Sequence, residues 1–276
     1  MITTATINSK TFGRGYLTAI TMVDGFASPT VQSSMYYNSG NHGGKIPNSY
    51  WRERILVFDL SVRGTSVATY VAERDAIIKA FGLPRTGIAT MTFTTLDGRN
   101  LQFDVQLRNI TGPFQRGQNS FGNLRVELIA PSPYIIAQSA TDTAVTLPSG
   151  AGTVIPAIIP MDLSFGSGVG ETITLSGNGL YFPTVTIVGP CTDPIIRNNT
   201  TSLQIQVTGT FTGSDTIVVD MENETVTQNG STNLLENTVG DFWALVAGAN
   251  AVIFSSGIYD AAASATFTWR DSWLGI

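Results

Sequence analysis

The sequence predicts a mainly β protein with two domains: an N-terminal β-rich domain with one α-helix, followed by a C-terminal β-sandwich. Many short runs alternate apolar and polar residues with a period of two, which is typical of strands, whereas a single stretch has helical spacing. Only 13% of the residues are charged, and Gly and Thr are abundant. A chain of 276 residues with 42% apolar residues is long enough for two separate cores.

Residues 1–136 are expected to form the first domain. The longest strand candidate, residues 52–62, carries apolar side chains on both faces, so both faces should be partly covered. Asp97 and Gly98 lie between two alternating runs, at the place where a two-residue hairpin turn requires positive φ. Residues 38–48 are rich in Gly and Asn, and we expect a loop that only a partner would order.

One segment of the first domain, residues 66–81, is predicted to be helical. Ser66 can cap its N-terminus, and Gly82 followed by Pro84 ends it. Apolar residues spaced three and four apart form a stripe that should pack on a sheet. The members of this stripe are Val67, Tyr70, Val71, Ile77, Ile78 and Phe81.

Residues 137–157 are expected to link the domains, because small residues, Gly and Pro replace the periodic pattern there, although some of them could add an edge strand. The second domain, residues 158–276, contains only strand-like runs. Within residues 181–207, two alternating runs flank a Gly- and Pro-rich bend, which predicts two strands and a defined loop. Asn229 and Gly230 predict a further tight turn.

The charge is unevenly distributed along the chain. Thirteen of the 15 Lys and Arg residues, but only eight of the 20 Asp and Glu residues, precede residue 136, so the two parts carry net charges of +5 and −10. This asymmetry fits two separately patterned domains. The Arg residues of the first part are dispersed among strand residues, which favours solvated strand faces or subunit contacts over nucleic-acid binding.

The sequence favours assembly in a reducing compartment. Cys191 is the only cysteine, which excludes an internal disulfide bond. No run approaches the ~20 apolar residues of a membrane span, and no signal-like segment opens the chain. We therefore expect neither a membrane protein nor a secreted precursor.

No set of residues predicts a catalytic, metal or cofactor site. His42 is the only histidine, and no Gly-x-Ser-x-Gly motif accompanies it. One His and one Cys are too few for a zinc site. The glycines between residues 166 and 170 have neither the spacing of a dinucleotide fingerprint nor the Lys of a P-loop. We therefore expect a protein that is not an enzyme.

A group of acidic residues in the second domain leaves an alternative open. Asp220, Glu222 and Glu224 alternate along a predicted strand, and paired carboxylates can hydrolyse glycosides, although a solvated strand face explains them better.

The aromatic residues Tyr181, Trp243 and Trp269 are candidates for contact with a glycan or a partner protein. The same residue types are preferred in cores and interfaces, and Trp243 with Phe242 is expected to anchor the core of the second domain.

Four segments of the second half share their order and spacing with a known family: NG followed by FPTVTIVGPCTDPIIRN, then TIVVDMENETVTQNG, DFWALVAGANAVIF and ATFTWRDSWLGI. They resemble the C-terminal domain of distal tail proteins of long, flexible-tailed bacteriophages. In the first half the resemblance is looser and is carried by YWRERILVFDLSVRG, the single helix, the hairpin LDGRNLQFDVQL and the segment APSPYI.

The resemblance implies a structural virion protein at the distal end of the phage tail, synthesised in the host cytoplasm, with a ring-forming first domain and a galectin-like second domain. Proteins of this family form a ring of six copies that joins the tail tube to the tail-tip adhesion device. The implied partners are other copies of the chain, the tail tube protein, the tape-measure protein and the tail-tip or receptor-binding proteins. DNA would pass through the bore without specific recognition. The alternative function is that of a carbohydrate-binding accessory protein that recognises a host surface glycan.

A ring needs two complementary surfaces on each subunit. The first domain offers the long strand at residues 52–62 and the hairpin around Asp97. Arg52, Arg54 and Arg63 could pair with Asp or Glu of a neighbouring copy, and we predict that they contribute to the oligomer interface.

Overall fold

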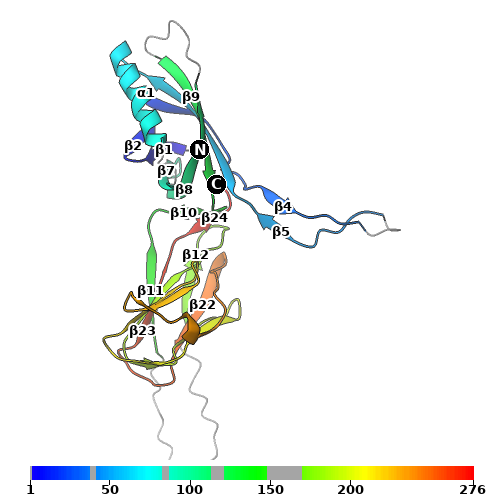
Figure 1. Ribbon diagram of the computed structural model, residues 1–276, viewed down its shortest axis with the longest axis vertical. Coiled ribbons are helices and arrows are strands. Elements are labelled where there is room, and N and C mark those ends of the chain that lie inside the picture. Colours follow the sequence, from blue (N-terminus) through cyan, green and yellow to red (C-terminus); the bar gives the residue numbers. More distant parts are fainter. Residues whose placement is uncertain (1, 38–41, 83–86, 113–120, 148–169) are drawn as a thin grey trace, which may run out of the picture. The chain divides into compact units, whose positions relative to one another are not determined.

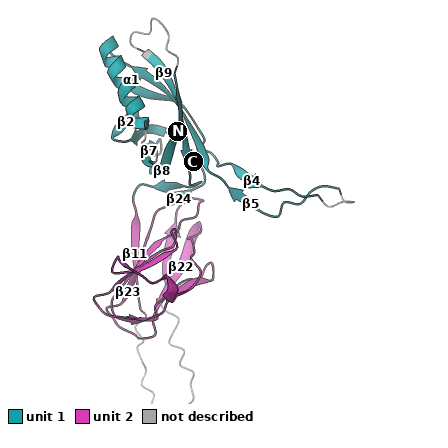
Figure 2. Cartoon of the chain, in the orientation of Figure 1, with its two compact units in different colours: residues 1–139, 272–276 teal, residues 140–271 magenta. Residues whose placement is uncertain are grey.

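The computed structural model describes residues 2–37, 42–82, 87–112, 121–147 and 170–276 (Figure 1). Strands dominate this part of the chain, and one α-helix accompanies them, so the predicted mainly β fold class is confirmed. The chain divides into two compact units (Figure 2): unit 1 comprises Met1–Ser139 and Ser272–Ile276, and unit 2 comprises Ala140–Asp271.

Unit 1 is built on one sheet with the strand order β2-β1-β7-β8-β9-β6-β3. Its strands are β1 (Ile2–Ile7), β2 (Lys10–Gly13), β3 (Thr18–Asp24), β6 (Arg54–Arg63), β7 (Ala89–Thr95), β8 (Asn100–Thr111) and β9 (Phe121–Ala130). Strand β8 is long enough to pair with β7 along its first half and with β9 along its second half. Two short strands extend the sheet, because β10 (Ile135–Ala137) pairs with both β8 and β24 (Ser272–Trp273).

The helix α1 (Val67–Phe81) forms where the sequence predicts it. The Ser66 side chain accepts a hydrogen bond from the first turn, and the Gly82 amide donates one to the Ile78 carbonyl at 2.8 Å. Only part of the predicted stripe is covered: the helix buries Ile77, Ala80 and Phe81, whereas Val67, Val71 and Ile78 remain exposed. In the described part of the chain, no helix has the length and apolar character needed to cross a membrane.

Phenylalanine rings form the centre of the core of unit 1. The Phe26 ring meets those of Phe58, Phe93 and Phe103 edge-on, with centroid distances of 5.8, 5.1 and 5.5 Å. Edge-to-face contacts of this kind stabilise aromatic clusters beyond the burial of their area. Since Phe26 follows the end of β3, this cluster fixes the chain at the point where it leaves the sheet.

Between β3 and β6 the chain forms a two-stranded hairpin of β4 (Val31–Ser33) and β5 (Ser49–Trp51), which extends away from the sheet of unit 1 (Figure 1). The sequence predicts a loop over much of this region, residues 38–48. Residues 38–41 lie outside the described part, and the residues on either side of them are joined by an isolated bridge between Tyr36 and Lys45.

The two tight turns that the sequence predicts are present. At the first, Gly98 adopts a φ of +84° and the hairpin joins β7 to β8, although Asp97 keeps a negative φ, so the turn is not of the predicted two-residue type. At the second, Asn229 and Gly230 have φ values of +51° and +70° and join two strands of unit 2.

Unit 2 is a sandwich of two antiparallel sheets whose inward side chains form one core. The six-stranded sheet has the order β11 (Thr141–Thr146), β23 (Ser264–Trp269), β13 (Thr184–Val188), β18 (Thr216–Asp220), β19 (Thr225–Gln228) and β20 (Thr232–Asn233). The five-stranded sheet has the order β12 (Glu171–Leu175), β22 (Gly248–Ser255), β15 (Ile195–Asn198), β16 (Leu203–Val207) and β21 (Thr238–Gly240). A small pair, β14 (Cys191–Thr192) and β17 (Thr210–Phe211), and a short 3-10 helix, Leu235–Asn237, complete the unit.

The two strands predicted within residues 181–207 are β13 and β16, and they lie in opposite sheets of the sandwich. The Gly- and Pro-rich bend between them carries the chain across the core and includes β14 and β15. In both strands the alternation points apolar side chains inward. Val185, Ile187, Ile205 and Val207 are all buried.

The observed division differs from the predicted domain boundaries in two places. Part of the predicted linker is strand β11, which pairs along its whole length with β23 of unit 2, because Val145 is buried in the core of that unit. The last five residues, 272–276, belong to unit 1, because β24 pairs with β10 and Trp273 packs on the core of unit 1. Residues 148–157 of the predicted linker lie outside the described part of the chain.

Candidate assembly surfaces

The hairpin that carries β4 and β5, here called the arm (residues 30–53), is exposed wherever the structure describes it. Val31 pairs with Trp51, and Ser33 pairs with Ser49, so the arm has a defined register. An isolated two-stranded hairpin is at best marginally stable in water, so this arrangement suits a segment that a partner covers.

Large apolar side chains are concentrated on the arm. Tyr37 is 72% exposed and Tyr50 is 66% exposed. The full set is Val31, Met35, Tyr36, Tyr37, Ile46, Tyr50 and Trp51. Aromatic residues are enriched in protein interfaces, and concentrated exposed apolar surface marks an interaction site. Val31, Tyr50 and Trp51 lie on the two paired strands, and Tyr36 lies in the isolated bridge with Lys45. The loop-like residues around them in the sequence give no sign of this pairing.

Arg54, predicted to lie in the oligomer interface, is buried instead. The residue is 1% exposed, and its guanidinium donates hydrogen bonds to the carbonyls of Gly25 at 2.7 Å, Pro133 at 2.8 Å and Leu274 at 2.5 Å. Burial lowers the pKa of this guanidinium to about 10, so it is still charged at neutral pH. The prediction for Arg54 is therefore wrong, because its charge is used inside unit 1 and does not face a neighbour.

The other two arginines of the predicted interface are exposed. Arg52 lies on the arm, next to Glu53, with Nε of Arg52 and Oε2 of Glu53 3.3 Å apart. Arg63 ends β6, and its amide donates to the Leu17 carbonyl at 3.0 Å while its side chain stays in solvent. The exposed ion pair of Arg52 contributes little to stability, so its side chain is available to a partner. The side chain of Arg63 is available because it is exposed.

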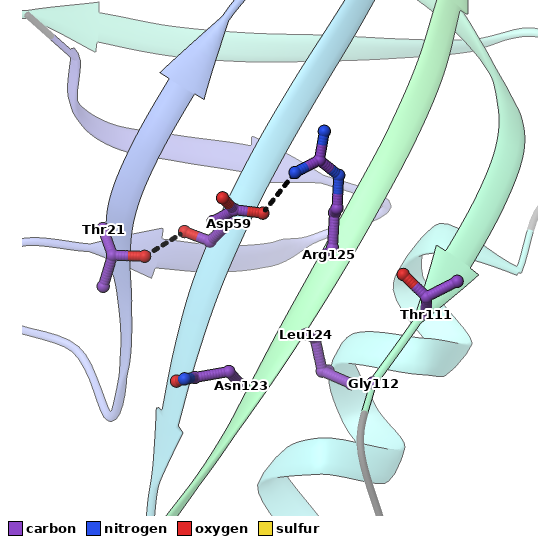
Figure 3. A pocket seen from close by; sticks show the side chains of 7 residues that line it. All are labelled: Thr21, Asp59, Thr111, Gly112, Asn123, Leu124 and Arg125. Atoms are coloured by element: carbon purple, nitrogen blue, oxygen red, sulfur yellow. Dashed lines mark hydrogen bonds and ion pairs between the residues drawn. The ribbon is translucent and has the colours of Figure 1, made fainter.

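A shallow pocket of about 490 Å³ lies on the sheet of unit 1 (Figure 3). It is lined by Thr21, Asp59, Thr111, Gly112, Asn123, Leu124 and Arg125. Figure 3 shows Asp59 and Arg125 pointing toward each other, with Nη1 of Arg125 3.8 Å from Oδ1 of Asp59, while the Thr21 hydroxyl donates to the Asp59 carbonyl at 2.8 Å. These groups can bind polar surface, but they include no nucleophile paired with a base.

In unit 2, the three predicted contact residues differ in how deeply they are buried. Trp243 is 1% exposed and Trp269 is 5% exposed, and both belong to the core of the sandwich. A ring in a packed core cannot stack on a sugar, so the predicted contact role of these two residues is wrong, and the predicted core role of Trp243 is confirmed.

Tyr181 lies at the edge of that core. It exchanges two backbone hydrogen bonds with Leu245, of 3.2 and 2.7 Å, and its ring is only partly buried. Partial burial raises the pKa of its phenol, and the positive charge of Arg270 opposes that rise. Tyr181 is therefore the one residue of the predicted set that could still meet a ligand or partner.

The acidic residues that could have formed a hydrolytic pair are not on one strand face. Strand β18 ends at Asp220, and Glu222 and Glu224 lie in the following turn. Asp220 accepts hydrogen bonds from the Glu222 and Asn223 amides, both at 3.0 Å, so it closes this turn. Among the described residues, no group of three His, Cys, Asp or Glu side chains is placed to hold a metal ion. His42 is exposed on the arm.

Comparison with known proteins gives a family match within residues 177–273 and a shared fold over nearly the whole chain. Residues 177–273 match the family model of the siphovirus-type tail component, C-terminal domain. A crystal structure of the Dit protein of phage SPP1, described as a paradigm of the hub adsorption apparatus in phages that infect Gram-positive bacteria, shares the fold with a TM-score of 0.70 and 14% identity, over 98% of each chain. A chain of the phage P2 baseplate in its activated conformation with calcium has a TM-score of 0.51 and 13% identity, over 100% of each chain.

No curated protein sequence matches the chain. The segments from which the sequence analysis inferred a resemblance in the second half lie within or overlap the matched residues 177–273. Residues 177–273 are therefore similar to the C-terminal domain of the siphovirus-type tail component family, and over 98% of its length the chain shares the fold of the SPP1 Dit protein.

Proposed function

We propose that this protein is a structural component of the distal tail of a long-tailed phage, and that its copies assemble into a ring of six. In that ring, unit 1 forms the subunit contacts, and unit 2 is the sandwich that neighbouring tail proteins meet. The observation that carries the proposal is the arm of unit 1, a hairpin with exposed aromatic side chains that no other described residue covers.

An arm of this kind suits a closed ring. A hairpin that reaches from one copy onto a different surface of the next makes a heterologous contact, and such contacts close when repeated around an axis. At each contact between neighbouring copies, the arm supplies one surface and the sheet or helix of unit 1 supplies the other. Each contact is modest, but a closed ring repeats it at every interface, so the assembly is more stable than any single pair.

The proposed ring joins the tail tube to the tail-tip adhesion device. The proposed partners are the tail tube protein, the tape-measure protein and the tail-tip or receptor-binding proteins, with DNA passing through the bore without specific recognition. The fold shared with the SPP1 Dit protein over 98% of the chain supports this proposal.

Light scattering on purified protein and on two variants tests the role of the arm. Changing Tyr37 and Trp51 together to Ser removes apolar surface from the arm, and we expect the ring mass of the unchanged protein to fall to that of a monomer. Changing Tyr16 to Ser is the matched control, because Tyr16 is exposed to a similar degree but lies outside the arm. A double variant that still forms rings would show that the arm is not the subunit contact.

A further inference from the structure

We infer that Arg54 is a positioning residue that closes the neck of the arm and ties it to the chain segments that lead to and from unit 2. The neck is defined here as residues 25–27, where the chain enters the arm, together with Arg54, where it returns to the sheet.

The first step concerns the two ends of the arm. Arg54 is the first residue of β6 and directly follows the arm, whereas Gly25 directly follows β3 on the entering side. Nη1 of Arg54 donates to the Gly25 carbonyl at 2.7 Å, so one side chain bridges both ends of the arm. Just beyond the neck, the Arg52 amide donates to the Thr30 carbonyl at 2.8 Å and begins the pairing of the two arm strands.

The second step concerns the other nitrogen of the same guanidinium. Nη2 of Arg54 donates to the Pro133 carbonyl at 2.8 Å and to the Leu274 carbonyl at 2.5 Å. Pro133 precedes β10, after which the chain passes into unit 2, and Leu274 follows β24, which forms after the chain has left unit 2. The guanidinium of Arg54, which holds the neck, therefore also holds the segments of Pro133 and Leu274 in unit 1.

The third step concerns the last residues of the chain, 272–276, here called the tail. The Ile276 amide donates to the Phe26 carbonyl at 3.2 Å, so the tail is bonded to the entering side of the neck. A Cβ atom on Gly275 would lie 1.8 Å from the Ala27 carbonyl oxygen, which means that the tail passes the neck without room for a side chain. The tail and the neck therefore determine each other's position.

The electrostatics fit a role in positioning. Among the described residues no carboxylate forms an ion pair with Arg54, and its charge is met by three carbonyls and by the ring of Phe103, whose centroid is 5.6 Å from Cζ. A buried charge without a counter-ion is a poor source of stability compared with apolar packing. A planar guanidinium can instead hold several acceptors in fixed directions, which a lysine ammonium cannot do.

Hydrogen exchange measured by mass spectrometry on the full chain tests the inference. In Arg54→Lys, we expect exchange in the tail and in the paired residues of the arm to become at least about tenfold faster, as the loss of one hydrogen bond to a charged group implies. The ladder between β6 and β9, from Ile55 paired with Ile129 to Val62 paired with Gly122, should keep its protection. Arg63→Lys is the matched control at the other end of β6.

Gly275→Ala makes the same test without touching Arg54, and it decides the matter if Arg54→Lys does not fold. Its Cβ must push the tail away from Ala27, so exchange in the tail and arm should again rise while the β6–β9 ladder stays protected. Unchanged exchange of the arm in Gly275→Ala would overturn the inference. Equal loss of protection throughout unit 1 would overturn it as well, because Arg54 would then be an ordinary element of the core.

The inference rests on the proposed function only in taking the arm as the subunit contact. The mass of the same samples separates the two ideas. If the unchanged protein forms no ring, the proposed function fails, whereas the exchange of the tail and arm still shows whether Arg54 and the tail set the position of the arm.

Discussion

Nη2 of Arg54 and the carbonyl oxygen of Leu274 are 2.5 Å apart, although 220 positions separate the two residues in the sequence. This hydrogen bond holds residues 272–276 against unit 1, beside strands that precede unit 2 in the sequence. Unit 1 is therefore completed only after unit 2 has been synthesised, which makes unit 2 an insertion in unit 1.

The first prediction follows from this contact. Arg54→Ala leaves three carbonyls without their donor and removes the contact with the Phe103 ring. We expect local opening of the neck and of residues 272–276 to become about 1–3 kcal/mol easier, because buried carbonyl acceptors are left without their donor, while the β6–β9 ladder changes less. Urea unfolding followed by hydrogen exchange of unit 1 measures the change. Arg125→Ala, which removes an exposed side chain of the same type, should change the stability by less than about 1 kcal/mol.

The second prediction concerns Trp243, the largest fully buried side chain of the chain's described part. Trp243→Ala should cost unit 2 about 3–5 kcal/mol, because it leaves a cavity in a closed core. Trp243→Phe should cost clearly less, since Nε1 of Trp243 has no hydrogen-bond partner among the described residues and the smaller ring still fills part of the space. Thermal unfolding measures both. An Ala variant as stable as the unchanged protein would contradict the assignment of Trp243 to the core.

The third prediction concerns the thiol of Cys191. Burial, with a smaller contribution from the negative charge of Asp215, raises the pKa of this thiol to about 11. At pH 8 the thiolate is therefore rare and inaccessible, and we expect a disulfide reagent such as DTNB to leave the folded protein unmodified. The same reagent should titrate one thiol per chain in guanidinium chloride. Rapid modification of the folded protein would show that β14 opens readily.

The fourth prediction is a pH dependence of unit 2. Hydrogen bonds lower the pKa of Asp215 well below its usual value: first that from the Thr212 amide, then those from the side chains of Thr212, Gln228 and Asn229. A carboxylate with a lowered pKa in the folded state adds stability above its ordinary pKa, and this stability is lost as the pH falls. Unit 2 should therefore become less stable between about pH 5 and pH 2.

Asp215→Asn tests this pH dependence, because it removes the charge and keeps the shape. We expect the variant to be less stable than the unchanged protein at pH 7, and the difference to narrow as the pH falls. Asp241→Asn, at an exposed position, is the control. A difference that stays constant from pH 7 to pH 2 would show that the charge of Asp215 does not contribute.

Local patterns in the sequence predict the elements that local forces form. Helix α1 begins after the cap at Ser66 and ends before Gly82, as the sequence indicates, because capping and spacing act over a few residues. The longer strands of unit 2, such as β13, β18, β22 and β23, follow from their period of two, because each has one buried face. The fold class could therefore be inferred without a structure.

The pairing of distant segments could not be predicted in this way. The alternation in residues 52–62 places Arg54 on the same face as Leu56 and Phe58, which already points to burial, but its three acceptors lie 29, 79 and 220 positions away. No local pattern encodes such partners. The return of residues 272–276 to unit 1 is missed for the same reason, since a strand as short as β24 has no period of its own.

The arm was only partly visible in the sequence. A Gly- and Asn-rich stretch with aromatic residues on both sides predicts a loop that a partner orders, and the structure describes the flanks of that stretch as two paired strands. The strands have three residues each, which is too short for alternation to reveal them. Their register depends on pairing with each other and on the fixed neck.

Photo-cross-linking from the arm tests the central claim most directly. A photoreactive phenylalanine analogue in place of Tyr37 would react with whatever covers the arm in the assembled protein. The account predicts a ladder of covalent species that ends at six copies, with the cross-linked peptide mapping to unit 1 of a second copy. Irradiated protein that remains a single-copy species at concentrations of tens of micromolar, or a cross-link that maps only to unit 2, would contradict it.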